Sequence, residues 1–154
     1  MVAKTIVLDT GPLGLATNPR MSAQSTACMR WIQSELSSGR RVIVPEIADY
    51  EVRRELLRAE KHAGVARLDM LIQQLDYLAI TTTAMQLAAQ LWAWTRRQGK
   101  PTADDRALDG DVILAAQLLT SRYPEAVIAT TNVGHLSLFV QAALWTDLVS
   151  GERP

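Results

Sequence analysis

The 154-residue chain is 48% hydrophobic and has a formal net charge of zero. This length and apolar content are sufficient for a substantial core, and we expect a single domain over residues 1–154 because no Pro/Gly/Ser-rich linker divides the chain. Zero net charge argues against a protein that coats nucleic acid non-specifically. The charge is unevenly distributed, however: residues 1–100 carry 13 Lys/Arg against 9 Asp/Glu, and residues 101–154 carry 3 against 7.

The single cysteine and the N-terminal region bear on the cellular compartment. Cys28 lies in an apolar helical pattern and has no partner for a disulfide, so we expect a packed thiol and a reducing cytoplasm. The apolar run before Asp9 is too short for a signal-peptide core or a membrane span. We therefore expect a cytoplasmic protein that does not interact with a membrane.

The first candidate functional residue is Asp9, which follows the short apolar run Ile6-Val7-Leu8 and precedes Gly11-Pro12. Such a run is typical of a strand buried on both faces in a parallel sheet, and the Gly-Pro pair predicts a turn. Open α/β sheets bind ligands beyond the carboxyl ends of their strands. Asp9 is thus a candidate for chemistry, although it could equally cap the next segment by accepting backbone N–H groups.

The following segments alternate between helical and strand patterns. One of them carries a second candidate acid, because positions 47, 50, 51 and 54 share a helix face on which Ile47 and Tyr50 are apolar, so Glu51 is expected to point inward. Glu55 is expected to pair with Arg58 or pack against Arg54. The predicted elements are helices over 21–36, from 46 through 58, and over 65–75, with strands over 41–45 and 77–81.

Acidic residues concentrate in the second half of the chain, where residues 104–111 contain four aspartates and precede an apolar helical run. A helix N-terminus favours anions, so Asp109 and Asp111 are placed to face a strand-end crevice. The buried run 126–129 then ends in Thr130-Thr131-Asn132. We also predict a helix from Thr83 to about residue 97 and a terminal strand over 143–149, which gives a mainly parallel sheet between helices.

This order of elements brings Asp9, Glu51, Asp111 and the turn containing Thr130 and Asn132 to one edge of the sheet. Carboxylate oxygens without nearby Cys or paired His suit Mg²⁺ or Mn²⁺ rather than zinc. Two such ions can activate water and stabilise the leaving oxygen in phosphodiester hydrolysis. A phosphatase with an aspartate nucleophile is disfavoured, because Gly11 stands where that chemistry uses a second aspartate.

Four segments in this order resemble the PIN-domain ribonucleases, a family that includes the VapC-type toxins. They are Val7-Leu8-Asp9-Thr10, the stretch from Val44 to Glu51, Asp111-Val112-Ile113-Leu114-Ala115-Ala116, and Ala129-Thr130-Thr131-Asn132. The resemblance implies a three-layer α/β/α PIN fold in which Asp9, Glu51 and Asp111 bind metal, while Thr10 and Thr130 orient the site. It also implies RNA as substrate, a homodimer and an antitoxin protein as partner.

The chain departs from the family pattern after the last core strand, where many members carry a further aspartate. Here Asn132 and His135 occupy that neighbourhood, and Asp104 or Asp109 are alternative compensating ligands. The preferred hypothesis is a Mg²⁺/Mn²⁺-dependent endoribonuclease. The alternative is a catalytically weakened PIN-like module that binds nucleic acid. The candidate catalytic residues are Asp9, Thr10, Glu51, Asp111, Thr130 and Asn132.

Two further sets of residues carry expectations about binding. Helical spacing favours Trp92 and Trp94 as core and interface anchors rather than base-stacking platforms, and together with the apolar face of residues 65–75 they predict a homodimer or a partner surface. Phosphate contacts are expected from two basic groups. These groups are Arg53, Arg54 and Arg58, and Arg96, Arg97 and Lys100.

Overall fold

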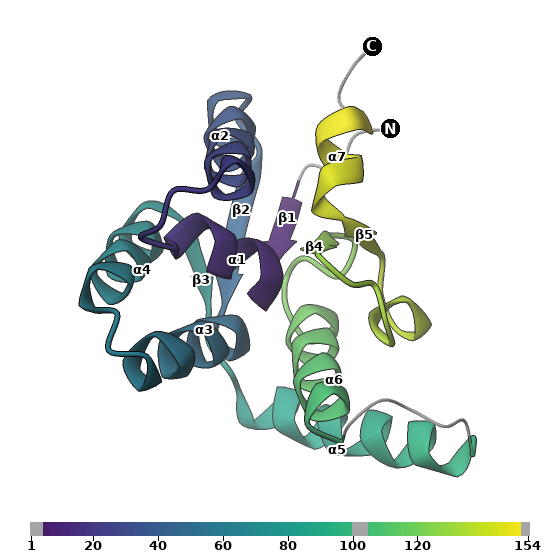
Figure 1. Cartoon of the computed structure of the whole chain (residues 1–154). Coiled ribbons are helices and arrows are strands. Elements are labelled where there is room, and N and C mark those ends of the chain that lie inside the picture. The colour runs from purple at the N-terminus through teal and green to yellow at the C-terminus, as the bar shows by residue number, and fades with distance from the viewer. Residues whose placement is uncertain (1–4, 100–104, 152–154) are drawn as a thin grey trace.

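The computed structural model describes residues 5–99 and 105–151 (Figure 1). Within these ranges five strands alternate with helices in the order expected for a parallel α/β protein. The strands are β1 (Thr5–Leu8), β2 (Arg41–Pro45), β3 (Asp76–Leu78), β4 (Val127–Thr130) and β5 (Ala142–Leu144). The helices are α1 (Thr10–Thr17), α2 (Ala23–Ser37), α3 (Glu46–Arg58), α4 (His62–Gln74), α5 (Thr82–Arg97), α6 (Asp105–Leu119) and α7 (Trp145–Gly151), with a 3₁₀ turn, η1 (Leu136–Leu138).

The strands form one sheet in the order β3-β2-β1-β4-β5, and every neighbouring pair is parallel. Strand β1 is central, with Ile6 opposite Val42 of β2 on one side and Val127 of β4 on the other. All five carboxyl ends therefore meet at one edge. The predicted three-layer α/β/α fold with a mainly parallel sheet is confirmed.

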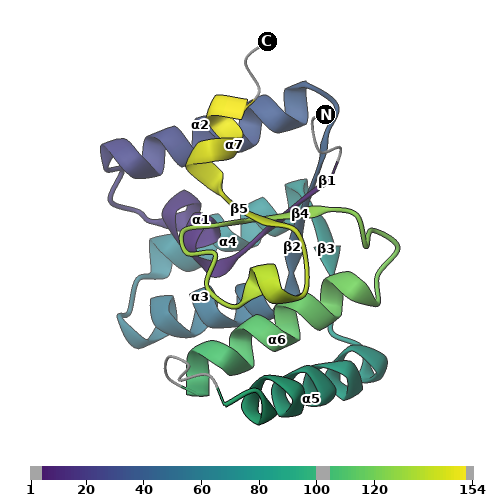
Figure 2. The same ribbon diagram turned by 90° about the vertical axis from the view of Figure 1, so that its right-hand side faces the viewer.

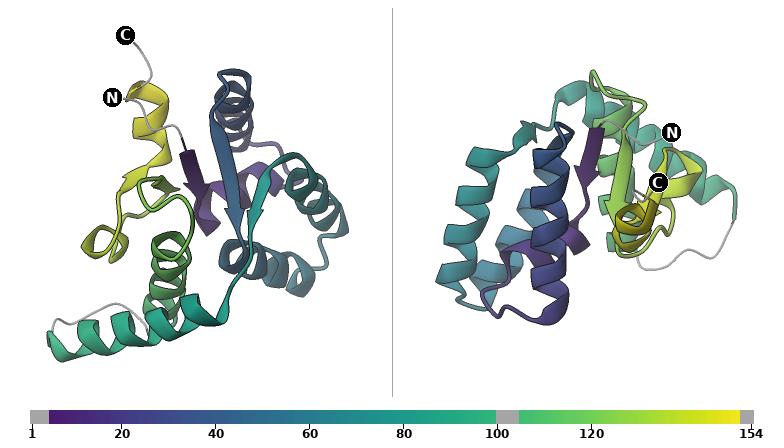
Figure 3. Two further views of the ribbon diagram at one scale, coloured as in Figure 1. Left: turned by 180° about the vertical axis from the view of Figure 1, so that it is seen from behind. Right: turned by 90° about the horizontal axis from the view of Figure 1, so that it is seen from above.

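Alternate residues of β1 face two different helical layers. Ile6 and Leu8 pack in a core shared with α1, α2, α3, α4 and Trp145 of α7, whereas Val7 faces a second core that includes Leu114 of α6. Helix α5 packs on the outer side of α6, away from the sheet (Figures 2 and 3). The central strand is thus buried on both faces, as its unbroken apolar run predicts.

Three of the predicted elements need correction. Gly11-Pro12 does not form a separate turn, because both residues lie in the first turn of α1, where a missing proline N–H costs nothing. The strand predicted over 77–81 ends at Leu78, since the Ile80 N–H donates to Glu46 Oε1 at 2.6 Å. The strand predicted over 143–149 ends at Leu144 and continues as α7.

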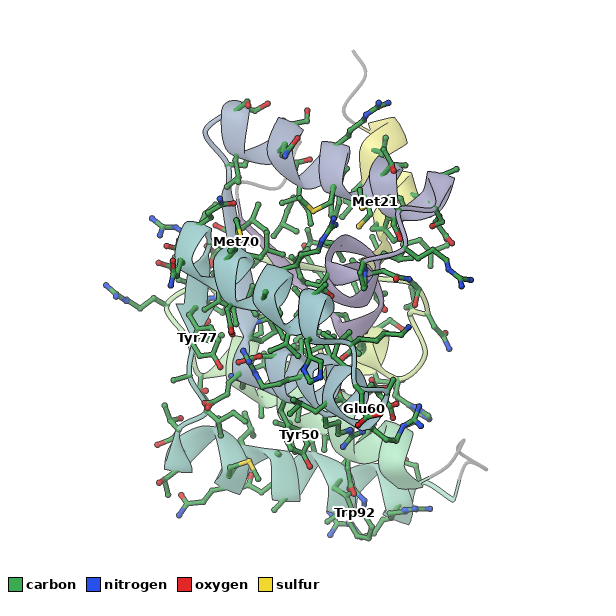
Figure 4. All side chains as sticks on the ribbon, turned by 60° about the vertical axis from the view of Figure 1, so that its left-hand side comes forward. Met21, Tyr50, Glu60, Met70, Tyr77 and Trp92 are labelled. Atoms are coloured by element: carbon green, nitrogen blue, oxygen red, sulfur yellow. The ribbon has the colours of Figure 1, made fainter. Side chains whose placement is uncertain are left out.

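The interpretation of the tryptophans also changes. The buried pair is Trp31 and Trp145, whose rings are 5.8 Å apart, whereas the side chains predicted for the core are partly exposed: Trp92 by 37% and Trp94 by 43%. In Figure 4 Trp92 lies on α5, on the same side of the molecule as Tyr50 of α3. The α4 face predicted for an interface is instead mostly buried in the core. Cys28 is a buried thiol, as expected.

A buried glutamine on α6 links two elements beyond the sheet edge. Gln117 Oε1 accepts the Ile47 N–H at 3.2 Å, and its Nε2 donates to the Leu78 carbonyl at 2.7 Å. Replacing Gln117 by leucine leaves both backbone groups without this partner, so we expect the free energy of unfolding to fall by about 2–4 kcal/mol. Urea denaturation measures the change. Gln90→Leu on the exposed face of α5 is the control, and equal effects of the two substitutions would contradict this role.

None of the helices in the described part of the chain is long and apolar enough to cross a membrane.

Candidate metal centre

Asp9 stands at the junction between β1 and α1. Its backbone N–H donates to the Ala129 carbonyl at 2.9 Å, which ties this end of β1 to β4. Its Oδ1 accepts the Thr10 N–H at 2.7 Å, and its Oδ2 accepts the Thr130 hydroxyl at 2.7 Å. Asp9 therefore combines the two roles that its sequence position suggested, a helix cap and a place at the sheet edge: one carboxylate oxygen caps α1, and the other faces β4.

Glu51 reaches the same edge from the second turn of α3. Thr10 Oγ1 donates to Glu51 Oε1 at 2.9 Å, so α1 and α3 are joined directly at the site. Arg54 Nη2 lies 3.6 Å from Glu51 Oε2, one turn further along the helix. Glu51 thus points inward as predicted, with a hydroxyl donor on one oxygen and a guanidinium near the other. Glu55 pairs with Arg58 at 2.8 Å on the exposed side of α3.

Asp111 approaches from α6 and meets the loop that follows β4. The backbone N–H of His135 donates to the Asp111 carboxylate, and His135 Nδ1 lies 3.7 Å from Asp111 Oδ2. Among the candidates for a fourth ligand, His135 therefore lies next to this acid. Asp109 is exposed two residues earlier on α6, and Asp104 lies outside the described residues.

The loop after β4 is held by its own hydrogen bonds. Thr130 Oγ1, which donates to Asp9, also accepts the Asn132 N–H at 3.1 Å. Asn132 is exposed, and its Oδ1 accepts the Gly134 N–H at 3.1 Å. A Cβ atom built on Gly134 would lie 3.6 Å from Asp111 Oδ2 and 3.7 Å from Asn132 Oδ1. The side chain of Asn132 is therefore near Asp111 but is engaged in its own turn.

The three acids destabilise one another's charged forms. Burial raises the pKa of Asp9, although hydrogen bonds from Thr130 and Thr10 oppose the rise. Burial also raises the pKa of Glu51, and the charge of Asp9 adds to the effect. Asp111 is affected most: burial and the charges of Asp9 and Glu51 raise its pKa to about 7. Such a cluster of carboxylates is stabilised by a cation.

The raised pKa of Asp111 predicts how the metal-free chain responds to pH. Between the ordinary value of 3.8 and about 7, the unfolded chain releases this proton while the folded chain keeps it. The contribution of Asp111 to stability is present below pH 4 and is lost as the pH rises through 7. Thermal denaturation of the chain in chelator, with Asp111→Asn as reference, should show this difference. Parallel pH profiles for the two proteins would contradict it.

Two glycines, Gly110 and Gly11, let the elements of the site approach one another. A Cβ atom on Gly110 would lie 3.0 Å from Glu51 Oε2, so a side chain there would crowd the acid of α3. A Cβ atom on Gly11 would lie 2.3 Å from Thr131 Oγ1 and 2.5 Å from its Cγ2. The contact partners lie far away in the sequence, so no local pattern marks these glycines.

The first predicted basic group lies beside the acids, but its arginines are already paired. Arg53 lies 3.0 Å from Asp49 and 2.9 Å from Asp69, so its guanidinium is shared between two carboxylates, and its contact with a phosphate stays a prediction. Arg54 stacks on Tyr50 at 5.0 Å as well as pairing with Glu51. In the second group the Arg96 guanidinium lies 5.2 Å from the centre of the Trp92 ring, and Lys100 lies outside the described residues.

The donor set can be compared with what a metal ion requires. Among the described residues, no three His, Cys, Asp or Glu side chains are already arranged to hold a metal ion. The chemistry of the donors nevertheless fits a hard divalent cation. Asp9, Glu51 and Asp111 supply carboxylate oxygens, their pKa values are raised by burial, and an ion between them would relieve their repulsion. His135 adds one nitrogen donor, which Mn²⁺ tolerates better than Mg²⁺.

Neither a family model nor a curated protein matches the sequence, but solved structures match its fold. A chain of the promoter-DNA-bound VapBC2 of Rickettsia felis aligns with a TM-score of 0.68 and 13% identity, over 92% of this chain and 98% of that one. DNA-bound VapBC of Salmonella typhimurium gives 0.64 and 19%, over 94% and 99%. VapC20 of Mycobacterium tuberculosis, described as a toxin that cleaves the sarcin-ricin loop, gives 0.60 and 16%, over 88% and 95%. The chain therefore has the fold that these VapBC and VapC20 structures share.

Proposed function

We propose that the protein is a Mg²⁺- or Mn²⁺-dependent endoribonuclease that hydrolyses RNA phosphodiester bonds, as the toxin of a VapBC-type toxin–antitoxin pair. The observation that carries the proposal is the cluster of Asp9, Glu51 and Asp111. These acids come from three elements to the carboxyl edge of one sheet, where burial raises the pKa of all three and neighbouring carboxylates add to the rise for Glu51 and Asp111. The fold shared with a toxin described as cleaving the sarcin-ricin loop supports the same reaction class.

In this proposal the three acids hold the metal, and two threonines position them. A bound divalent ion supplies an activated water and charge stabilisation at the leaving oxygen. The Thr10 hydroxyl donates to Glu51 Oε1 and the Thr130 hydroxyl donates to Asp9 Oδ2, so the two threonines fix the orientation of both carboxylates. Asp9 Oδ1 also serves as the α1 cap, which restrains its rotation.

Cleavage of a mixed-sequence RNA across a Mn²⁺ and Mg²⁺ titration tests the proposal. Asp9→Asn keeps the size of the side chain and one acceptor oxygen, which can still cap α1, but removes the charge and the second acceptor, and it also controls for contaminating nuclease. We expect metal-dependent cleavage by the unaltered chain that falls at least 100-fold in Asp9→Asn. Equal degradation by both proteins at every metal concentration would overturn the enzyme reading. RNA binding without cleavage would instead support the weakened PIN-like binding module.

The position after β4 gives a second, independent expectation. Asn132 and His135 provide neutral donors where many PIN domains have a carboxylate, so a second ion should bind weakly and favour Mn²⁺. Asn132→Asp adds a carboxylate that can still accept the Gly134 N–H, so the turn is retained. We expect this variant to cleave RNA at lower Mg²⁺ concentrations than the unaltered chain. An unchanged Mg²⁺ dependence would show that position 132 takes no part in metal binding.

We further propose a homodimer and an antitoxin protein as the assembly partners of this chain. The VapBC and FitAcB structures with the same fold are named as two-component complexes, which supports an antitoxin partner. The partly exposed Trp92 and Trp94 on α5 support a further protein contact, because large aromatic side chains are enriched at interfaces. Light scattering at high protein concentration tests whether the chain forms a homodimer. A monodisperse monomer would contradict the proposed homodimer.

A further inference from the structure

A groove of about 260 Å³ adjoins the carboxylates on the side of α1 and α3. Its near end is formed by Thr10 and Glu51, so the groove is continuous with the candidate metal centre. Its far end is formed by Asn18, Arg58 and Lys61. It is smaller than the roughly 300–1,000 Å³ clefts that enclose drug-sized ligands, and its size therefore suits one unit of a longer ligand.

The chemistry of the lining changes along the groove. Val52 and Leu56 are nearly buried and, with Gly14 and Ala59, give the middle an apolar surface. The near end presents carboxylate and hydroxyl oxygens, and the far end presents two cations. This order suits a polynucleotide that is cleaved at the carboxylates: the apolar middle suits a ribose and base, and the cationic end suits a phosphate.

We propose that this groove binds the RNA nucleotide adjacent to the scissile phosphate, with its base or ribose on the apolar middle and its outer phosphate at Lys61 and Arg58. The inference rests on the proposed function, because it takes the bond cleaved to be an RNA phosphodiester held at Asp9, Glu51 and Asp111. It adds the direction in which the substrate leaves the site, along α1 and α3.

The charges at the far end support a phosphate there. No acidic side chain of residues 5–99 or 105–151 forms an ion pair with Lys61. Arg58 is paired with Glu55 at 2.8 Å, but both side chains are strongly exposed. Exposed pairs of this kind contribute little stability, so Arg58 can turn to a phosphate at small cost.

The backbone that presents Lys61 has a defined conformation. In the turn that follows α3, Glu60 adopts the left-handed conformation, at a φ of 55°. This turn is closed by hydrogen bonds from the Lys61 N–H to the Leu56 carbonyl at 2.8 Å and from the Glu60 N–H to the Leu57 carbonyl at 3.1 Å. Glu60 is labelled in Figure 4, where α3 gives way to α4. Lys61 is thus the first residue after the turn, and its backbone position is fixed by α3.

Gly14 keeps the middle of the groove open. A Cβ atom built there meets only Val52 Cγ2, at 3.9 Å, which is ordinary van der Waals contact. A larger side chain at position 14 therefore occupies the groove without forcing the backbone apart. Since Gly14 lies within α1, replacing it also improves helix propensity by up to about 1 kcal/mol. Gly14→Leu is consequently a blocking variant that should fold.

The experiment compares cleavage of RNA oligonucleotides of increasing length by the unaltered chain, Gly14→Leu and Ala27→Leu, a control at an exposed position of α2. We expect kcat/KM of the unaltered chain to rise when the nucleotide that fills the groove is added. Gly14→Leu should lose that rise, by at least tenfold, while thermal stability does not fall and Mn²⁺ affinity stays unchanged. If Gly14→Leu shows the same gain with length as Ala27→Leu, the groove does not bind RNA.

The failure of this inference can be told apart from the failure of the proposed function. If none of the three proteins cleaves RNA, the proposed function fails. Fluorescence anisotropy of the same oligonucleotides then tests whether the groove binds RNA. RNA binding to Gly14→Leu that is at least tenfold weaker than binding to Ala27→Leu supports an RNA site in the groove, and equal binding to the two variants overturns it. A Gly14→Leu variant that retains RNA binding but loses a protein partner would assign the groove to a peptide and also overturn the inference.

The cationic end has its own readout. One phosphate contact to single-stranded nucleic acid contributes about 0.7 to the slope of log affinity against log salt. Lys61→Gln should reduce that slope by about this amount, whereas Arg30→Gln on the exposed face of α2 should not change it. A merely structural role of Lys61 would lower the thermal midpoint and leave the slope unaltered, and that outcome would contradict phosphate binding.

Discussion

Asp111→Asn should make the metal-free protein more stable and at the same time abolish its response to metal. The substitution removes a carboxylate whose pKa is raised to about 7 by burial and by the charges of Asp9 and Glu51. Above pH 7 the unaltered chain must keep this charge beside two others, and the variant does not. We expect a thermal midpoint higher by roughly 2–4 °C in chelator, and loss of the stabilisation that Mn²⁺ gives the unaltered chain.

RNA cleavage should change in the opposite direction, by a loss of at least 100-fold, because the amide no longer neutralises a cation. Asp109→Asn is the matched control, since Asp109 is exposed on the same helix two residues earlier. It should leave the midpoint, the metal response and cleavage nearly unchanged. If Asp111→Asn lowers the midpoint in chelator as well as the activity, the acid is a structural residue and the three-carboxylate site fails.

Gly11→Ala should damage the site through the loop after β4. The added methyl group would lie 2.3 Å from Thr131 Oγ1 and 2.9 Å from its Cβ, and rotating a β-branched side chain cannot clear all of these atoms. Either α1 or the loop must move, which costs about 1–3 kcal/mol. The neighbouring residues Asp9 and Thr130 share a 2.7 Å hydrogen bond, so we expect cleavage to fall at least tenfold as well.

The double variant Gly11→Ala with Thr131→Gly separates this contact from other effects. Removing the Thr131 side chain clears the three atoms nearest to the methyl group, so stability and cleavage should return to the level of Thr131→Gly alone. Urea denaturation and the RNA cleavage assay measure both. If the double variant is as impaired as Gly11→Ala, the loss arises within α1 and the proposed contact is not its cause.

The parts of the fold that could be predicted from sequence are those specified by local patterns. The apolar run of β1 and the proline that ends β2 each mark their own element, so a parallel sheet between helices could be predicted, but the order of its strands could not. Helix α1 was not predicted, because the pair Gly11-Pro12 occurs both in turns and in the first turn of a helix. Residues 143–149 were predicted as one strand, although the helix α7 begins at Trp145, because a short apolar run does not distinguish a strand from a helix.

The same division applies to the candidate site. The sequence places three acids at one edge of the sheet, because each lies at a predictable position of a strand or helix: Asp9, Glu51 and Asp111. The sequence does not predict their hydrogen-bond partners. The hydrogen bonds from Thr10 to Glu51 and from Thr130 to Asp9 depend on how the elements pack. Ion pairs between elements are equally hard to predict from sequence. The pairing of Arg53 with Asp69 of α4 cannot be inferred from the sequence of α3 alone.

The central place of β1 in the sheet has a consequence for synthesis of the chain on the ribosome. β1 is made first, and β2 follows soon enough to pair with it, but its other neighbour, β4, is among the last segments made. Until then one edge of β1 has unpaired N–H and C=O groups. The pairing of Asp9 with Thr130 and Ala129 joins residues far apart in the chain, the kind of contact that forms slowly. The nascent protein therefore lacks the β4 side of this edge, Thr130 included, until residues 127–130 have been translated.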